Sequence, residues 1–173
     1  MHKPIIISIF LWLVIGLVYV HASSNTTLPP FSFVKYCVEN PRYCEKSAVE
    51  QTTDDYALLN KINILVNHTM ESVDEPNGQD VWHSNGKSGD CEDFALTKRK
   101  MLIDLGIPQS ALRIATAYTN EGLGHAVLVV KTKKGNLVLD NLTDDIKIWN
   151  KTALHWIKIQ SETDPRIWYF LKK

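Results

Sequence analysis

The sequence has no apolar stretch of the ~20 residues that a membrane-spanning helix needs. Its longest apolar stretch, residues 5–20, follows one basic residue and leads to small residues at positions 22–24. This layout is typical of a secretory signal peptide that is cleaved after Ala22. We therefore expect residues 1–22 to be a signal peptide and residues 23–173 to be a single exported domain, with an uncleaved membrane anchor as the alternative.

The sequence also has no excess of charge of either sign. It contains 19 basic and 19 acidic residues, and its densest basic run is Lys98-Arg99-Lys100. Three like charges on a predicted helix usually form its solvent-exposed face, whereas a nucleic-acid-binding domain carries a basic patch. We therefore expect no nucleic-acid partner. With 45% hydrophobic and 22% charged residues, the composition is that of a globular protein and excludes a disordered or fibrous one.

Cysteine is scarce, and its odd number is informative. The chain has three cysteines, Cys37, Cys44 and Cys91, and an oxidising compartment pairs thiols, so one of them stays unpaired in a monomer. Cys37 and Cys44 are close in sequence, and Pro41 between them indicates a turn, so we favour a disulfide between these two. Cys91 is then the free thiol, which is either a nucleophile or a small buried hydrophobic residue.

The spacing of apolar residues predicts an α+β domain, with helices in the N-terminal half packed on an antiparallel β-sheet. Residues 23–32 and 71–88 are rich in turn-forming residues, and we expect a flexible start and a loop there. The predicted helices are residues 53–70 and a segment from Asp90 or Cys91 to Leu105; the predicted strands are residues 112–118, 125–132, 137–142 and 167–171.

The start of the second predicted helix carries the candidate chemistry. Cys91 lies in its first turn, where unpaired backbone N–H groups and the helix dipole stabilise a thiolate. Asp90, Glu92 and Asp93 crowd the same turn, and their charges raise the pKa of a thiol. A nearby cation is needed to offset them, either a protonated histidine, a bound metal ion or both. The alternative is that the acidic turn only caps the helix, with Asp90 as the N-cap residue.

His125 is the histidine best placed to pair with Cys91. It follows two glycines and opens a predicted strand, while His68 lies among polar residues of a helix and His83 and His155 lie in loop-like surroundings. A zinc site is less favoured, because Cys91 and His125 lack the neighbouring Cys and His residues that zinc sites use.

Asp140 is the group expected to orient His125. If the turn at residues 133–136 forms a two-residue hairpin loop, Asp140 lies opposite Val127 or Val129, on the sheet face that carries His125. Together with Cys91, these residues form a nucleophile, base and orienting group.

Several segments resemble the bacterial transglutaminase-like cysteine proteinases, which include the LapG-type periplasmic proteases. The resemblance covers nearly the whole chain after the signal peptide. It rests on Gly89-Asp90-Cys91-Glu92-Asp93-Phe94-Ala95-Leu96-Thr97-Lys98, Gly124-His125-Ala126-Val127-Leu128, Val138-Leu139-Asp140-Asn141-Leu142 with Trp149, Asn60-x-x-Asn63, Asp80-Val81-Trp82, and Phe33-x-x-Tyr36-Cys37 with Pro41 and Cys44.

The resemblance implies a papain-like, transglutaminase-type core with a catalytic triad of Cys91, His125 and Asp140. It also implies calcium held by Asp90 and Glu92, and no organic cofactor. LapG-type members act in the periplasm, where they cut large cell-surface adhesins and so release biofilm cells, under the control of an inner-membrane receptor that sequesters the protease.

The expected function is therefore hydrolysis of a peptide bond in an exported protein, by a monomeric cysteine peptidase. We expect the backbone N–H of Cys91 to stabilise the oxyanion, with the Asn63 amide as a second donor. Two alternatives remain open. In the first, the domain is a catalytically silent binding module. In the second, the same triad passes the acyl group to an amine, as transglutaminases do.

Overall fold

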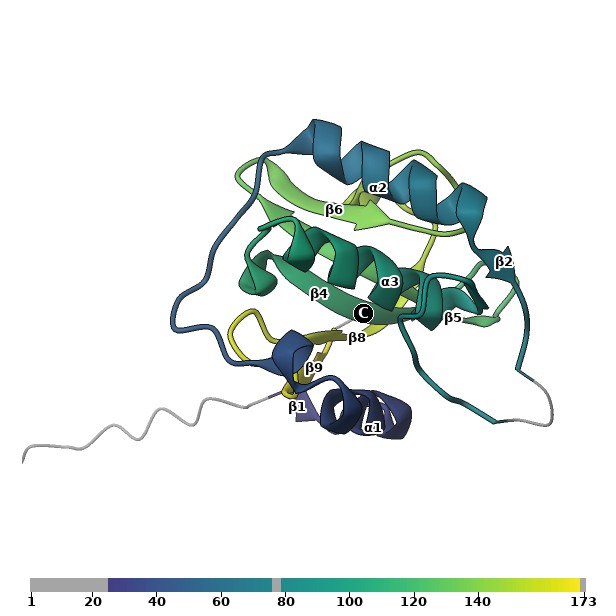
Figure 1. The fold of residues 1–173 in the computed structure, drawn as a ribbon, viewed down its shortest axis with the longest axis horizontal. Helices are drawn as coiled ribbons and strands as arrows, with labels where there is room; N and C mark the ends of the chain where they lie inside the picture. Colours follow the sequence, from purple (N-terminus) through teal and green to yellow (C-terminus); the bar gives the residue numbers. More distant parts are fainter. Residues whose placement is uncertain (1–24, 76–78, 172–173) are drawn as a thin grey trace, which may run out of the picture.

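The structure is a computed structural model that describes residues 25–75 and 79–171 (Figure 1). The predicted signal peptide, residues 1–22, lies outside the described residues. Within the described part of the chain, no helix combines the length and the apolar character that crossing a membrane requires.

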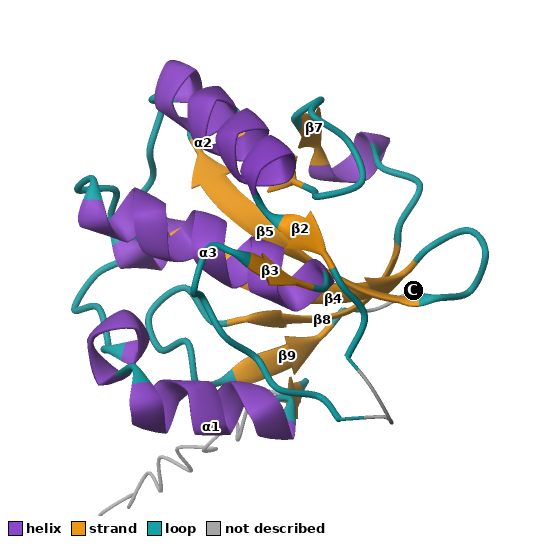
Figure 2. Ribbon diagram, turned by 45° about the vertical axis from the view of Figure 1, so that its right-hand side comes forward, coloured by secondary structure: helices purple, strands orange, loops and turns teal. Residues whose placement is uncertain are grey.

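Three α-helices lie against one face of a large sheet (Figures 1 and 2). They are α1 (Phe31–Glu39), α2 (Tyr56–Thr69) and α3 (Cys91–Asp104), and α2 and α3 are the two predicted helices. Helix α1 was not predicted, because its sequence FSFVKYCVE is short and directly follows two prolines. Its buried residues, among them Phe33 and Tyr36, belong to the main core. Within residues 23–32, where a flexible start was expected, residues 26–27 form β1 and residues 31–32 begin α1.

The sheet is antiparallel throughout, and its strand order is β1-β9-β8-β4-β5-β6-β7. This confirms the α+β class. A separate pair, β2 and β3, is parallel and flanks the segment that leads to α3. The strands are β1 (Thr26–Thr27), β2 (Glu71–Ser72), β3 (Ser88–Gly89), β4 (Leu112–Tyr118), β5 (Gly124–Thr132), β6 (Gly135–Leu139), β7 (Lys147–Ile148), β8 (His155–Gln160) and β9 (Trp168–Phe170). Short 3-10 helices occur at Pro41–Cys44, Gln109–Ala111 and Trp149–Lys151.

Two strand predictions were wrong in detail. Strand β8, with His155 at its start, stands where a loop was expected, because its half-exposed residues give a weak apolar signal. Strand β6 ends at Leu139, so Asp140 begins the following loop rather than continuing the strand to residue 142.

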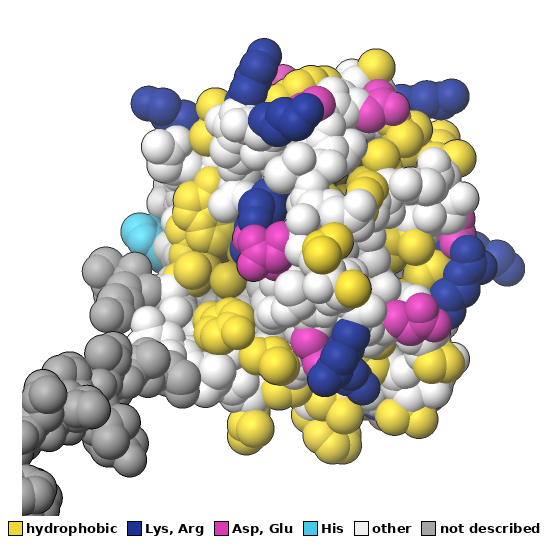
Figure 3. All heavy atoms as spheres, turned by 90° about the vertical axis from the view of Figure 1, so that its left-hand side faces the viewer, with side chains coloured by type: hydrophobic (Ala, Val, Ile, Leu, Met, Phe, Trp, Pro, Cys, Tyr) yellow, Lys and Arg dark blue, Asp and Glu magenta, His cyan; other side chains and the backbone are white. Residues whose placement is uncertain are grey.

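The basic run on α3 is buried, which corrects the expected solvent-exposed face. Lys98 is 0% and Arg99 1% exposed, because α3 packs on β5 of the sheet and lies alongside α2 (Figure 2). Arg99 is satisfied there: its guanidinium donates to the carbonyls of Leu112 and Tyr43 at 3.0 and 2.6 Å and to Gln109 Oε1 at 2.9 Å. Lys100 pairs with Asp104 at 2.7 Å nearer the surface. On the surface itself, Figure 3 shows basic and acidic side chains interspersed across the face drawn.

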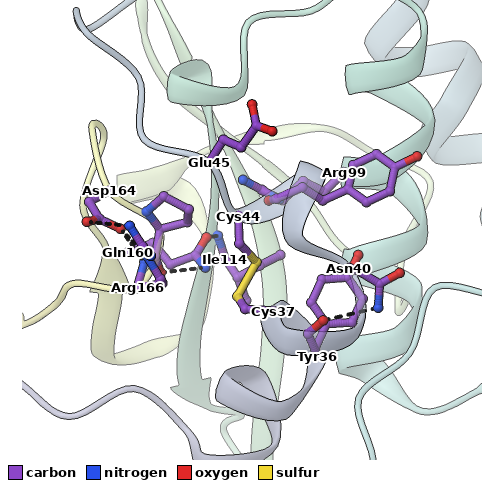
Figure 4. Close-up of a disulfide and its surroundings, with 12 residues drawn as sticks. Tyr36, Cys37, Asn40, Cys44, Glu45, Arg99, Ile114, Gln160, Asp164 and Arg166 are labelled. Atoms are coloured by element: carbon purple, nitrogen blue, oxygen red, sulfur yellow. Dashed lines mark hydrogen bonds and ion pairs between the residues drawn. A yellow bond between two sulfur atoms is a disulfide. The ribbon is translucent and has the colours of Figure 1, made fainter.

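A disulfide joins Cys37, in α1, to Cys44, at the end of the 3-10 helix that follows (Figure 4). Both cysteines are buried and belong to the main core. Tyr43, next to Cys44, accepts the Arg99 bond described above, so the disulfide-closed segment is tied to α3.

Replacement of both cysteines, Cys37→Ala with Cys44→Ala, should lower the free energy of unfolding by about 2 kcal/mol, because an eight-residue loop is no longer closed in the unfolded chain. Urea denaturation measures the loss, and the variant's curve should be insensitive to reductant. An unfolding midpoint equal to that of the parent protein would contradict a stabilising disulfide.

Candidate active site

Cys91 lies at the first position of α3, at the side of a cleft of about 620 Å³. It is the free cysteine and is partly buried. The cleft is lined from the loop before α3, from the α3 start, from the β4–β5 hairpin and from β8; its residues include Trp82, Asp90, Glu92, Tyr118 and His125. The fold thus brings Cys91 and His125 to one cleft.

The thiol is fixed between a helix and a strand. The N–H of Ala126, in β5, donates to Cys91 Sγ at 3.3 Å, so the strand start that carries His125 is in contact with the sulfur. Cys91 Sγ in turn donates to Glu92 Oε2 at 3.1 Å. Burial, followed by the charge of Glu92, raises the pKa of the Cys91 thiol. A positive charge is therefore required before the thiolate can form near neutral pH.

His125 and Asp140 are in direct contact. His125 Nε2 lies 2.8 Å from Asp140 Oδ1, and both residues are buried. The β5–β6 hairpin creates this contact, because Thr132 pairs with Gly135 and leaves a two-residue loop. Continuing that register places Asp140 opposite Val127. Of the two positions expected from the sequence, Val127 and Val129, this is the one nearer to His125.

The Asp140 carboxylate is ionised in spite of its burial. Burial raises its pKa, but the hydrogen bond and charge of His125, the N–H of Leu142 and the charge of Lys98 outweigh that effect, so the pKa is lowered. Leu142 N donates to Asp140 Oδ1 at 3.0 Å. An ionised Asp140 can orient the His125 ring and stabilise an imidazolium.

The acidic turn does more than cap α3. Asp90 occupies the N-cap position, yet its side chain makes no capping hydrogen bond, and its buried Oδ1 has no partner among the described residues. Asp90 is thus the N-cap residue by position, as expected, but its side chain does not cap the helix. Asp93 is fully buried and accepts a hydrogen bond from the His83 N–H at 2.7 Å, with the His83 ring 3.2 Å away. Burial raises the pKa of Asp93 to about 6.

Asp90 and Glu92 present two adjacent carboxylates to the cleft. Burial, followed by contact with Asp90, raises the pKa of Glu92 to about 8, net of the Cys91 hydrogen bond that lowers it. No cluster of three or more His, Cys, Asp or Glu side chains in the described residues is arranged to hold a metal ion. The pair nevertheless fits part of the oxygen set of a hard cation, since one oxygen is unpartnered and calcium accepts carbonyl and water oxygens as further ligands.

Asn63 is placed away from the thiol. Its amide is completely buried and donates to the carbonyls of Asp144 and Thr143 at 3.0 and 3.4 Å. It is not among the residues that line the cleft of Cys91. The geometry gives Asn63 a structural role, holding the loop after β6, in place of the expected oxyanion donor.

Asn67 and Lys98 were not identified from the sequence as parts of the site. Asn67 Nδ2 donates to the Asp140 carbonyl at 3.0 Å and to Asp144 Oδ1 at 3.0 Å. Lys98 lies two helical turns after Cys91, and its positive charge acts to lower the pKa of Asp140. The available signals were spacings: Asn67 is four residues after Asn63, and Lys98 is seven after Cys91.

Comparisons with known proteins bear on the family and the fold. The model of the family "bacterial transglutaminase-like cysteine proteinase BTLCP" matches residues 23–173. Among solved structures, calcium-bound LapG of Legionella pneumophila is similar, with a TM-score of 0.55 and 24% identity over 74% of this chain and 73% of that one. The EGTA-treated form of the same protein has a TM-score of 0.58 and 23% identity, over 82% and 77%. No curated protein matches the chain.

Gly89 is required by the approach of the chain to Asp93. Its φ is +155°, and a Cβ at this position would lie 2.1 Å from Asp93 Oδ2 and 2.5 Å from Asp93 Cβ. The substitution Gly89→Ala should therefore displace the start of α3 and lower the free energy of unfolding by at least about 2 kcal/mol. Thermal unfolding measures this. Gly122→Ala is the matched control for positive φ without a clash, and an equal loss in both variants would contradict the steric explanation.

Proposed function

Because this chain belongs to the bacterial transglutaminase-like cysteine proteinases, we propose that it hydrolyses a peptide bond with Cys91, His125 and Asp140. The observation that carries the proposal is a pair of contacts made by two neighbouring residues of β5. Ala126 N–H holds the Cys91 sulfur, and the preceding residue, His125, binds Asp140 at 2.8 Å.

In this proposal each member of the triad has a defined role. Asp140 occupies Nε2 of His125, so Nδ1 is the ring nitrogen that exchanges protons with Cys91. The thiolate attacks the substrate carbonyl carbon, and Nδ1–H protonates the amine as the C–N bond breaks. His125 then takes a proton from water, whose oxygen attacks the thioester and releases the acid and the thiol. The Cys91 N–H, at the helix start, is the proposed donor to the oxyanion.

The substrate cleft suits an extended polypeptide. A second, largely apolar cleft of about 900 Å³ adjoins the cleft of Cys91, and the two share Tyr118, Thr119 and Ile157. Leu154, Trp156 and Phe170 provide further apolar surface there. A continuous groove of this kind can bind several residues on one side of the cleaved bond, which supports a protein substrate.

The cellular setting is part of the proposal. Cleavage of the signal peptide after Ala22 would leave residues 23–173 as one domain in the periplasm, and the family match begins at residue 23. The disulfide between Cys37 and Cys44 suits an oxidising compartment. A large surface adhesin is the proposed substrate, and an inner-membrane receptor the proposed regulator, both by analogy with LapG-type proteases.

Calcium is the proposed cofactor, with Asp90 and Glu92 as ligands. It would neutralise the two carboxylates beside the thiol and so favour the thiolate. Support comes from the unpartnered Asp90 oxygen, from the raised pKa of Glu92 and from the similar Legionella protein, described as calcium-bound.

An activated Cys91 should react quickly with iodoacetamide at pH 7, and His125→Ala should slow that reaction at least about tenfold because the imidazolium partner is lost. His155→Ala, which removes an exposed histidine of β8, is the control and should react as the parent does. Mass spectrometry of the non-reduced protein reports alkylation of Cys91 alone, since Cys37 and Cys44 are joined.

Cleavage itself is tested with a peptide library of mixed sequence. The parent should cut it and Cys91→Ala should not. Cutting by Cys91→Ala would end the proposal. Fast alkylation without cutting, but with incorporation of an added primary amine, would instead show acyl transfer.

Calcium at 100 times its Kd should raise the melting temperature by about 5 °C relative to EGTA, because it binds the folded chain. Asp90→Ala should lose this shift, whereas Glu121→Ala, which removes an exposed carboxylate of the β4–β5 hairpin, should keep it. Differential scanning fluorimetry provides the measurement. Equal melting temperatures of the parent in calcium and in EGTA would argue against the site.

A further inference from the structure

Helix α2 presents two asparagines to the loop that follows β6. Asn63 and Asn67 are one turn apart and so lie on the same face of the helix. Asn63 is fully buried and Asn67 is half-buried. Asparagine is a poor residue for the interior of a helix, because its amide competes with the backbone for hydrogen bonds. The two asparagines therefore need a reason other than helix formation.

The two amides hold different parts of the loop. Asn63 binds the carbonyls of Thr143 and Asp144, as described above. Asn67 Nδ2 donates to the Asp140 carbonyl at 3.0 Å. It also donates to the Thr143 carbonyl at 3.1 Å and to Asp144 Oδ1 at 3.0 Å. Three acceptor oxygens surround this nitrogen, and they determine the orientation of the amide. Asn67 thus joins the first residue of the loop to its far end.

The backbone of Asp140 depends on this contact, because Asp140 lies just outside the sheet. The β5–β6 pairing ends with Leu139, one residue earlier. His125 and the Leu142 N–H bind Asp140 at 2.8 and 3.0 Å, and both bind its carboxylate. The Asn67 bond is made to the backbone of Asp140, and it comes from a helix that packs on α3. Asn67 therefore fixes the position from which the carboxylate reaches His125.

We propose that Asn67 is a positioning residue, which holds the backbone of Asp140 so that the carboxylate stays within hydrogen-bond distance of His125. The inference rests on the proposed function of the triad. Asn67 is not among the residues that line the cleft of Cys91, so its effect on the thiol passes through Asp140. Without the Asn67 amide, Asp140 has more positions open to it, and its carboxylate orients the His125 ring less well.

The rate of Cys91 alkylation by iodoacetamide at pH 7, measured on the full chain, tests this role. Asn67→Ala should slow the reaction about fivefold. At 1.4 kcal/mol per factor of ten, this corresponds to the ~1 kcal/mol that one hydrogen bond contributes. Asp140→Asn should slow it further, because the charge that stabilises the imidazolium is lost.

The double variant, Asn67→Ala with Asp140→Asn, shows whether the effect passes through the carboxylate. Residues that act through one contact are not additive, whereas independent structural changes are. In the Asp140→Asn background, the Asn67 substitution should therefore change the alkylation rate by less than about twofold.

His68→Ala is the matched control. It removes another contact between α2 and the same loop, the exposed pair of His68 Nε2 with Asp144 Oδ2 at 2.7 Å, and leaves the bond to the Asp140 carbonyl in place. Its alkylation rate should stay within about twofold of the parent, since an exposed ion pair contributes little. Thermal unfolding checks that each variant is folded. If Asn67→Ala does not fold, Asn67→Ser serves the same comparison.

Two results would make Asn67 a structural residue and overturn the proposal: an unchanged rate in Asn67→Ala, or an equal loss with and without the Asp140 carboxylate. Failure of both Asn67 variants to fold would do the same. An unchanged rate in Asp140→Asn would reject the triad, and the role of Asn67 with it. Alkylation needs no substrate, so a non-additive loss in a protein that cuts no peptide would support the role of Asn67 and reject hydrolysis separately.

Discussion

The contact between the start of α3 and the start of β5 determines the geometry of the whole site. Cys91 is the first residue of the helix, and the Ala126 N–H of the strand binds its sulfur. Helix α3 packs along β5, so the side chain next to Ala126, His125, is brought to the same cleft. The β5–β6 hairpin then delivers Asp140 through its two-residue loop. The positions of His125 and Asp140 relative to the thiol therefore both follow from the packing of α3 on β5.

Local patterns were sufficient to predict this docking pair, and insufficient for the elements around it. The helix from Cys91, the strand predicted at 125–132 and the register of the hairpin all depend on contacts between residues that are close in sequence or on a clear apolar period. Helix α1 and strand β8 are defined by what packs on them. Their sequences are short or half exposed, and contacts with residues distant in sequence hold them, as in the hydrogen bond between Tyr36 and Ser84 and the pairing of β8 with β4.

The residues of the candidate site differ in the same way: local patterns were sufficient to predict some of them and insufficient for others. Cys91, His125 and Asp140 could be proposed from the sequence because each stands at an informative place: a helix start, a strand start and a hairpin register. Lys98 was misjudged because a run of like charges gives no indication that tertiary packing has buried it. Asn63 was misjudged because an amide on a helix can face either a cleft or a loop, and only the positions of the Thr143 and Asp144 carbonyls decide which.

The outermost strands of the sheet, β1 and β7, have two residues each. So short an edge presents few free backbone groups, and another extended chain finds little on which to add itself as a further strand. In the proposed function, extended substrate backbone would find few free backbone groups at these two edge strands, and the groove beside the thiol is where we propose that it binds.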